Sequence, residues 1–291
     1  MADFDSTEPP TISPTVGRRW LAQELRRLRE AAGLKQADVA RRLRCNPAKV
    51  GHMETMRNAI SGPDLEVVLP FLGVPAERVG WYLQLADVAK EKGWWDGNQA
   101  IPEWFSLYIG LEWGASEIRE WDLGFIPGIL QTRAYAEGLL RSGDRAGAVG
   151  LTDQVDARLQ RQGALGRGSG ALSLHAIVDE SVLHRAVGDG DVMRDQLRHL
   201  VASAEHRQAV LQVMPLSAGP HRGQLGSFSW LGFPRVDDVG VVYVENQRGG
   251  LFLEDPDEIE SFQNDFECLR EKALAPDDSK ALLVELAGDA A

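Results

Sequence analysis

The sequence predicts a mainly helical (mainly α) protein in which an N-terminal bundle of five helices precedes an α+β domain with an antiparallel sheet. Apolar residues recur at helical spacing between residues 16 and 92. Short runs of β-branched and aromatic residues, separated by Gly, Pro and Asp, follow from about residue 171. Parallel strands need long crossover connections, whereas these runs lie close together in the sequence, so we expect antiparallel pairing.

Composition divides the chain into three segments. Residues 1–15 are acidic, polar and proline-rich and lack the features of a signal peptide, so they predict a disordered tail. Residues 16–92 predict the helical bundle and residues 93–291 the α+β domain, with the boundary at the GWWDG turn. No apolar run in the sequence is long enough to span a membrane. Cys45 and Cys268 form neither a disulfide framework nor a zinc motif, so we expect a cytoplasmic protein.

The charge is unevenly distributed along the chain. The formal net charge is −12, but residues 16–60 hold 11 Lys and Arg against 4 Asp and Glu, a local charge of +7. The other residues therefore sum to −19. A basic segment on an acidic body is typical of a nucleic-acid-binding module, so double-stranded DNA is the expected partner.

The basic segment carries the clearest helix signals. The stretch VGRRWLAQELRRLREAAG places apolar residues on one helical face and ends at Gly33. A second helix is expected at about 36–43. A third begins after a break at Arg44, with Asn46 as its N-cap and Pro47 as its first residue. Two further helices, at about 63–72 and 75–92, complete the bundle.

Two short helices joined by a tight turn, second and third in a small bundle, make a helix-turn-helix. The third helix can then enter the major groove while the second braces it against the phosphates. The segment LRRLREAAGLKQADVARRL, followed by KV, Met53–Glu54 and Arg57, resembles the phage-repressor-like (XRE-type) helix-turn-helix family. The resemblance implies a structural pair between Arg29 and Glu54 and a phosphate contact for Gln36.

Several residues depart from the pattern that this resemblance implies. Arg44 stands in place of a common turn glycine and would need a left-handed conformation. Gly51 lies in the middle of the third helix, at a cost of about 1 kcal/mol relative to alanine. The other departures are Lys35 at the usual Ser or Thr cap, Pro47 and Ala48 at base-reading positions, and Met56 at a frequent glycine.

The expected DNA contacts lie at the start of the second helix, on the third helix and in the loop that follows. These side chains suit phosphates better than base edges, so we expect strongly salt-dependent binding with modest direct readout. The six candidate DNA-binding residues are Gln36, Ala48, Lys49, His52, Arg57 and Asn58.

Residues 91–135 contain five of the eight tryptophans in the chain. So many aromatic side chains can line a pocket for a flat or apolar ligand, or they can fill a core or an interface. With polar residues from later in the chain they give six candidate ligand-binding residues: Trp104, Tyr108, Gln131, Tyr135, His221 and Glu245.

The same stretch carries a second resemblance. The pattern GWW, W-x3-Y-x2-LE and PGILQT-x2-YA, continued by VDARLQRQ, VDESVLHRAVG and LFLEDPDEIESFQNDFECLREKALAPDDSKALL, is similar to the C-terminal domain of a large group of actinobacterial XRE-type regulators. The resemblance covers nearly the whole chain. It implies a transcriptional regulator or an antitoxin-like partner, and it implies no catalytic site and no ligand.

The C-terminal segment shows no catalytic or metal-binding motif. It lacks a G-x-S-x-G elbow, a Walker loop and H-E-x-x-H, and its histidines do not have metal-ligand spacing. We therefore expect no enzymatic activity, no catalytic residues, no metal and no cofactor. Its elements are strand-like runs and helices, among them a helix that starts at Pro256 with Asp255 as its cap.

Three functional interpretations follow. The leading one is a cytoplasmic, DNA-binding transcriptional regulator that acts as a homodimer, because one recognition helix specifies too few base pairs. Its C-terminal domain would dimerise and bind a small-molecule effector or a partner. The second is an antitoxin-like protein that binds a small companion protein. The third is a ligand-binding or enzymatic protein with a degenerate helix-turn-helix. The operator, the effector and the sign of regulation do not follow from the sequence.

Overall fold

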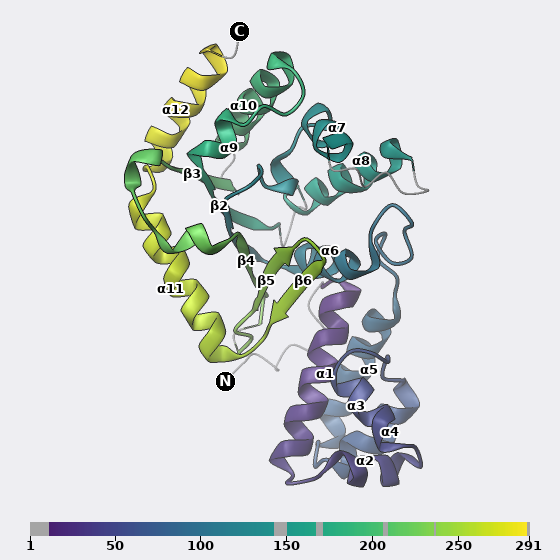
Figure 1. Ribbon diagram of the computed structural model, residues 1–291. Helices are drawn as coiled ribbons and strands as arrows, with labels where there is room; N and C mark the ends of the chain where they lie inside the picture. The colour runs from purple at the N-terminus through teal and green to yellow at the C-terminus, as the bar shows by residue number, and fades with distance from the viewer. Residues whose placement is uncertain (1–11, 143–149, 167–170, 206–208, 236, 290–291) are drawn as a thin grey trace. The chain divides into compact units, whose positions relative to one another are not determined.

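The computed structural model describes residues 12–142, 150–166, 171–205, 209–235 and 237–289. The chain divides into two compact units, Met1–Asp96 and Gly97–Ala291 (Figure 1). The sequence placed this boundary between residues 92 and 93.

Helix α1 (Pro14–Ala31) begins inside the segment that was predicted to be a tail. The Oγ atom of Ser13 accepts a hydrogen bond from the backbone amide of Val16 at 3.2 Å, and Pro14 occupies the first helical position. Thr15 is buried and accepts a hydrogen bond from the indole nitrogen of Trp95 at 3.3 Å. Residues 1–11 of the predicted tail lie outside the described residues.

The described part of the first unit is a bundle of α1 and four shorter helices: α2 (Gln36–Leu43), α3 (Pro47–Glu54), α4 (Gly62–Phe71) and α5 (Ala76–Lys90). Helix α1 packs against α3 and α5, and α2 packs against α3 and α4. All five contribute buried apolar side chains, among them Val16, Trp20, Leu25, Val39, Val50, Met53, Leu65, Leu69 and Leu85. The bundle predicted from helical periodicity is therefore present.

The described strands of the second unit form one six-stranded sheet, in the order β3-β2-β1-β4-β5-β6. The strands are β1 (Glu117–Asp122), β2 (Ser173–Asp179), β3 (Ala209–Met214), β4 (Phe228–Gly232), β5 (Val241–Asn246) and β6 (Gly249–Leu253).

The prediction of an antiparallel sheet is wrong for part of this sheet. Strand β2 pairs in parallel with β1 and with β3, and the other pairs are antiparallel. Helices α7 (Arg133–Ser142) and α8 (Leu151–Gln160) lie between β1 and β2 in the sequence. Helices α9 (Glu180–His184) and α10 (Gly190–Ala204) lie between β2 and β3. These are the long crossover connections that parallel pairing requires. The crossover between β1 and β2 could not be predicted, because EIREWD, which forms β1, precedes the strand-like runs that begin at about residue 171.

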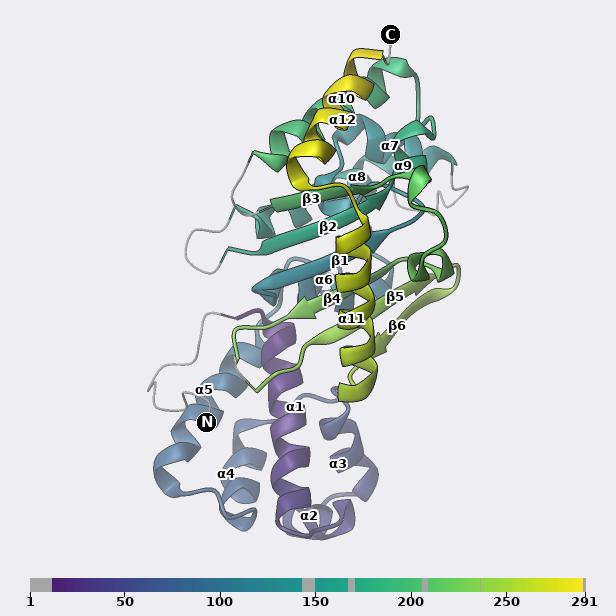
Figure 2. The same ribbon diagram turned by 90° about the vertical axis from the view of Figure 1, so that its left-hand side faces the viewer.

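Helices cover both faces of the sheet (Figures 1 and 2). Helix α11 (Pro256–Lys272) crosses one face and contacts β1, β3, β4 and β5 (Figure 2). Helices α6 (Glu103–Gly114), α7 and α8 lie on the other side of the sheet. The core under α11 consists of Trp121, Ile177, Met214, Phe228, Trp230, Val242, Ile259, Phe266 and Leu269.

Helix α12 (Pro276–Asp289) packs against α10 and covers the edge strand β3. The backbone amide of Val213 donates to Ser279 Oγ at 3.0 Å, and the amide of Leu274 donates to the Val213 carbonyl at 2.9 Å. These bonds satisfy backbone groups that an open edge would leave to solvent. Among the described helices, none combines the length and the hydropathy that a membrane span requires.

The packing of α11 generates a stability prediction. Phe266 is 1% exposed, and its ring contacts the ring of His175 edge to face at 5.1 Å between centroids. We expect Phe266→Ala to lower the free energy of unfolding of the second unit by about 3–5 kcal/mol, because it leaves a cavity under the helix. Urea unfolding followed by far-UV circular dichroism measures the change. Glu260→Ala, an exposed position on the same helix, is the control; equal midpoints for the two variants would contradict this packing.

Candidate nucleic-acid interface and ligand site

The turn between α2 and α3 has the geometry that its sequence requires. Arg44 adopts a left-handed conformation with φ of 53°. The amide of Cys45 donates to the Ala40 carbonyl at 2.9 Å and closes the end of α2. Asn46 then caps α3, its side chain accepting from the Ala48 amide at 2.9 Å. The strained conformation expected for Arg44 is confirmed, and Met56 also has a positive φ, of 59°.

Helix α2 begins without the usual hydroxyl cap. The backbone amide of Lys35 instead donates to the carboxylate of Asp38 at 2.9 Å. This is one half of a capping box, formed by the acidic residue in the first turn. Asp38 therefore explains how Lys35 is tolerated at the cap position.

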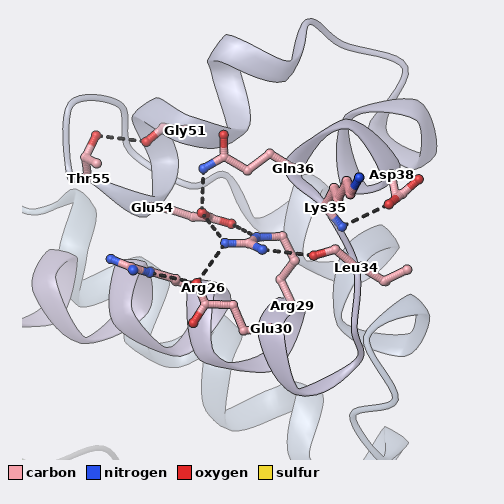
Figure 3. A network of polar contacts seen from close by, with 10 residues as sticks. All are labelled: Arg26, Arg29, Glu30, Leu34, Lys35, Gln36, Asp38, Gly51, Glu54 and Thr55. Atoms are coloured by element: carbon pink, nitrogen blue, oxygen red, sulfur yellow. Dashed lines mark hydrogen bonds and ion pairs between the residues drawn. The ribbon is translucent and has the colours of Figure 1, made fainter.

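A buried ion pair joins α1 to α3 (Figure 3). Arg29 Nε donates to Glu54 Oε1 at 2.6 Å, and its Nη2 donates to Glu54 Oε2 at 3.0 Å. A third donor of the same guanidinium bonds the Leu34 carbonyl at 2.9 Å. The hydrogen bond to Glu54 raises the pKa of Arg29 above its ordinary value, although burial opposes the charge. The pair implied by the resemblance is confirmed.

Gln36 belongs to this network (Figure 3). Its Nε2 donates to Glu54 Oε2 at 2.8 Å, which directs the amide toward α3. A Cβ atom at Gly51 would lie 3.2 Å from Gln36 Oε1, so the absence of a side chain at residue 51 leaves room for the amide. The mid-helix glycine is therefore explained by packing. The structure gives the Gln36 amide a structural bond to Glu54, and the phosphate contact that the resemblance implies stays a prediction.

The other candidate DNA-binding residues lie on α3 and in the loop that follows it. Ala48 is exposed near the start of α3, and Arg57 and Asn58 are exposed in the loop. His52 is partly exposed on the last turn of α3. Lys49 is also partly exposed, but its Nζ atom forms an ion pair with Asp64 of α4 at 3.0 Å. Five of the six candidates thus come from one continuous segment, and Gln36 contacts it.

Sequence reasoning overlooked other exposed cations of this unit. Lys35, Arg42 and Arg44 are exposed, and within the described residues none of their side chains forms an ion pair. The guanidinium of Arg42 lies over the ring of Phe71, with 6.0 Å to its centroid. The signal in the sequence was the local charge of +7, but it did not separate these cations from those that pair within the unit. The pairs are Arg18–Asp96, Arg26–Glu30, Arg27–Glu24, Arg29–Glu54, Arg41–Asp38 and Lys49–Asp64.

The second unit holds a group of charged side chains on the sheet face opposite α11, which we call the carboxylate cluster: Glu112, Glu120, Asp122, Glu245, Arg158 and Arg161. Arg161 Nε and Nη2 donate to the two oxygens of Glu112 at 2.9 and 2.6 Å. The Arg161 guanidinium also lies over the rings of Phe105 and Tyr108. This pair is almost fully buried, with side-chain exposures of 7% and 2%.

The carboxylates of β1 have fewer partners. Glu120 Oε1 accepts a hydrogen bond from Ser229 at 3.3 Å. Asp122 Oδ2 is buried and has no hydrogen-bond partner among the residues that the structure describes. Burial raises the pKa of Glu120 to about 7, against the opposing charge of Arg161. Burial and the charge of Glu120 raise the pKa of Asp122 well above its ordinary value.

The six candidate ligand-binding residues lie in different surroundings. Tyr108, Gln131, Tyr135 and Glu245 lie at the carboxylate cluster: Arg158 Nη1 donates to Gln131 Oε1 at 2.9 Å, and charges of the cluster act on the pKa values of both tyrosines. Trp104 lies on α6, with its ring next to Phe105 at 5.4 Å between centroids.

His221 lies apart from these residues. Its ring meets Trp121 edge to face at 5.2 Å between centroids, on the α11 side of the sheet, and its Nδ1 atom is buried without a partner. The sequence grouped it with the others because residue type alone does not show which sheet face a side chain occupies. The same limitation concealed Glu120 and Asp122, whose alternation with Trp121 was the available signal.

Comparison with known families divides the chain in the same way as the structure. A helix-turn-helix domain model matches residues 20–80, and the model of a domain of unknown function, DUF5753, matches residues 105–285. The chain belongs to the DUF5753 family. In this member the DUF5753 match contains the whole carboxylate cluster, and the helix-turn-helix match contains the Arg29–Glu54 pair. Comparisons with curated proteins and with solved structures gave no match.

In the described part of this DUF5753 protein, no group of three or more His, Cys, Asp or Glu side chains is arranged to hold a metal ion.

The Arg29–Glu54 pair generates the second prediction. Glu54→Gln keeps the size of the side chain but removes the buried carboxylate charge that pairs with Arg29, which among the described residues then keeps only Glu30 as an ionic partner, at 3.2 Å, so we expect the first unit to lose about 3 kcal/mol of stability. Hydrogen–deuterium exchange of peptides from α1 and α3 measures the loss within the full chain. Glu66→Gln, an exposed position on α4, is the matched control. Protection in Glu54→Gln equal to that of the control would show that the pair does not stabilise the unit.

The raised pKa of Glu120 generates the third prediction. The folded protein holds this proton up to about pH 7, whereas an ordinary glutamate ionises near 4.5. The associated stability is therefore complete at acidic pH and is lost as pH rises through about 7. Arg161, Glu112, Asp122, Glu245 and Tyr108 are the charged and titratable groups that act on Glu120 or face it.

Glu120→Gln is uncharged at every pH and should not lose this part of the stability. We expect the midpoint of thermal unfolding to fall between pH 5 and pH 8 more steeply in the unmodified protein than in the variant, by the equivalent of about 2 kcal/mol. Differential scanning calorimetry over this range measures the difference. Parallel curves for the two proteins would mean that Glu120 is ionised throughout.

Proposed function

We propose that this protein is an XRE-type transcriptional regulator that binds double-stranded DNA through α3 and the adjoining loop. The helix-turn-helix domain by itself indicates a DNA-binding regulator. The observation that supports the finer proposal is the bidentate Arg29–Glu54 pair, which fixes α3 while Ala48, Arg57 and Asn58 remain exposed.

The exposed side chains favour phosphate contacts over direct readout of bases. The first turn of α3 presents Pro47 and Ala48, which offer no hydrogen-bonding side chain, and the Asn46 side chain is occupied as a cap. Ala48 can contact the methyl group of thymine, which is a weak determinant. Lys35, Arg44 and Arg57 supply cations that can neutralise phosphates.

In this proposal the protein acts as a cytoplasmic homodimer, because one short recognition helix covers too few base pairs for a specific operator. The second unit serves dimerisation and the binding of an effector or a partner, and it carries no enzymatic activity. Sedimentation at micromolar concentration tests this part: a strictly monomeric species with and without its DNA would contradict the dimer.

DNA binding is tested by fluorescence anisotropy with duplexes from the region upstream of the protein's own gene, at salt concentrations from about 50 to 200 mM. We expect Arg57→Glu to weaken binding to all duplexes and to reduce the slope of log affinity against log salt by about 1. Arg44→Glu should act in the same direction.

Arg141→Glu is the matched control, because it makes the same charge change at a side chain 70% exposed in the second unit. Unchanged affinity in Arg57→Glu and Arg44→Glu for every duplex would count against the interface. Affinity no tighter than about 10⁻⁴ M at physiological salt would favour a helix-turn-helix that no longer functions on DNA.

A further inference from the structure

The carboxylate cluster has a defined place on the sheet. Glu120 and Asp122 are two residues apart on β1, so both side chains project from the same face, about 6.8 Å apart along the strand. In the sheet register Glu120 pairs with Ser229, and Ser229 pairs with Tyr243. Glu245 follows two residues after Tyr243 and projects from that same face. Three carboxylates and a tyrosine thus lie on neighbouring strands.

Several donors around this face already have partners. Arg161 donates to both oxygens of Glu112, and Arg158 donates to Gln131. The amide nitrogen of Gln131 donates to the Ile126 carbonyl at 2.7 Å. Two hydroxyls of this face also donate to its carboxylates, Ser229 to Glu120 at 3.3 Å and Tyr243 to Glu245 at 3.4 Å.

Within the described residues, few donors reach the carboxylates of β1. Asp122 Oδ2 is buried without a hydrogen-bond partner there, and Glu120 accepts one bond, from Ser229. Four carboxylates face two arginines, one of which is committed to Glu112. A buried acceptor without a donor is unfavourable, and a charged one more so. A bound group that brings donors and positive charge would satisfy both deficits.

We propose that the carboxylate cluster binds an organic cation, with a primary ammonium or guanidinium group held between Asp122 and Glu120 and its carbon skeleton against Tyr108 and Tyr243. This inference names the ligand class for the effector-binding role proposed above. It rests on that role of the second unit and does not depend on DNA binding.

The surroundings favour an organic cation over a metal ion. Within the described residues, no three of these side chains form a metal-binding group. The rings of Tyr108 and Tyr243 lie 4.4 Å apart between centroids, and Tyr243 also contacts Phe252 of β6. Aromatic faces attract ammonium and guanidinium groups, as Arg161 already shows on Phe105 and Tyr108.

The experiment uses the full chain without DNA, so that its result is independent of the proposed operator binding. Isothermal titration calorimetry at pH 7 compares n-butylamine and agmatine with n-butanol, and with potassium chloride and magnesium chloride at equal ionic strength. We expect saturable binding of the two cations, and none of n-butanol or of the salts.

Two variants locate the binding. Asp122→Asn should weaken the binding of both cations about tenfold or more, and the double variant Glu120→Gln with Asp122→Asn should abolish it. Both remove buried charge, so we expect them to fold, which circular dichroism checks. Glu103→Gln, an exposed carboxylate on α6, is the control and should bind normally.

A proton readout separates a ligand site from a merely structural role. A cation beside Glu120 favours the ionised carboxyl and should release protons on binding near pH 7, so the heats in phosphate and HEPES buffers, neither of which supplies a primary ammonium group, should differ. Absence of saturable binding by either cation, equal binding of n-butanol or magnesium, or unchanged affinity in Asp122→Asn would each overturn the proposal. A protonated Asp122 with no ligand would give the first of these results.

Discussion

The buried ion pair between Arg29 and Glu54 is the interaction on which the arrangement of the first unit depends. It joins the last turn of α1 to the last residue of α3, and Gln36 ties the start of α2 to the same carboxylate. Three helices therefore share one polar centre inside an apolar bundle. A short helix such as α3 has little intrinsic stability, so its orientation is set by contacts of this kind.

The second unit contains a comparable pair, Arg161 with Glu112, but in different company. Arg29 and Glu54 form two hydrogen bonds with one another, and their charges compensate. Arg161 and Glu112 also pair, but they lie beside two carboxylates of β1 whose charges they do not neutralise. Proteins seldom bury unpaired carboxylates, because the charged form loses its hydration. The Arg29–Glu54 pair therefore has compensated charges, whereas the carboxylate cluster has an excess of negative charge that protons or a bound cation would compensate.

Local features of the chain could be predicted from the sequence, and long-range ones could not. The bounds of α2, the cap at Asn46 and the left-handed Arg44 follow from residue types within one turn of each other. The Arg29–Glu54 pair came from a family resemblance and not from spacing. The parallel half of the sheet was missed because pairing depends on which segments form crossovers, and β1 was not recognised as part of the sheet.

The candidate sites show the same division. The exposure of Ala48, Arg57 and Asn58 could be predicted because a helix-turn-helix presents its third helix and the next loop in a known order. The partners of Lys49 and Gln36, by contrast, come from α4 and α3 and became visible only with the tertiary structure. In the second unit, four of the aromatic and polar candidates lie at the carboxylate cluster, but the two carboxylates of β1 required knowledge of which side of the sheet each residue faces.

Gly51 shows how a local rule can mislead protein engineering. Helix propensity alone marks this residue for replacement by alanine, with an expected gain of about 1 kcal/mol. The new methyl group would lie 3.2 Å from Gln36 Oε1, so the amide that helps to hold Glu54 would have to shift by a few tenths of an ångström. A gain in the helix propensity of α3 would thus be set against a disturbance of the contact that anchors the helix, and the freedom of Gln36 to move decides the sign of the net change in stability.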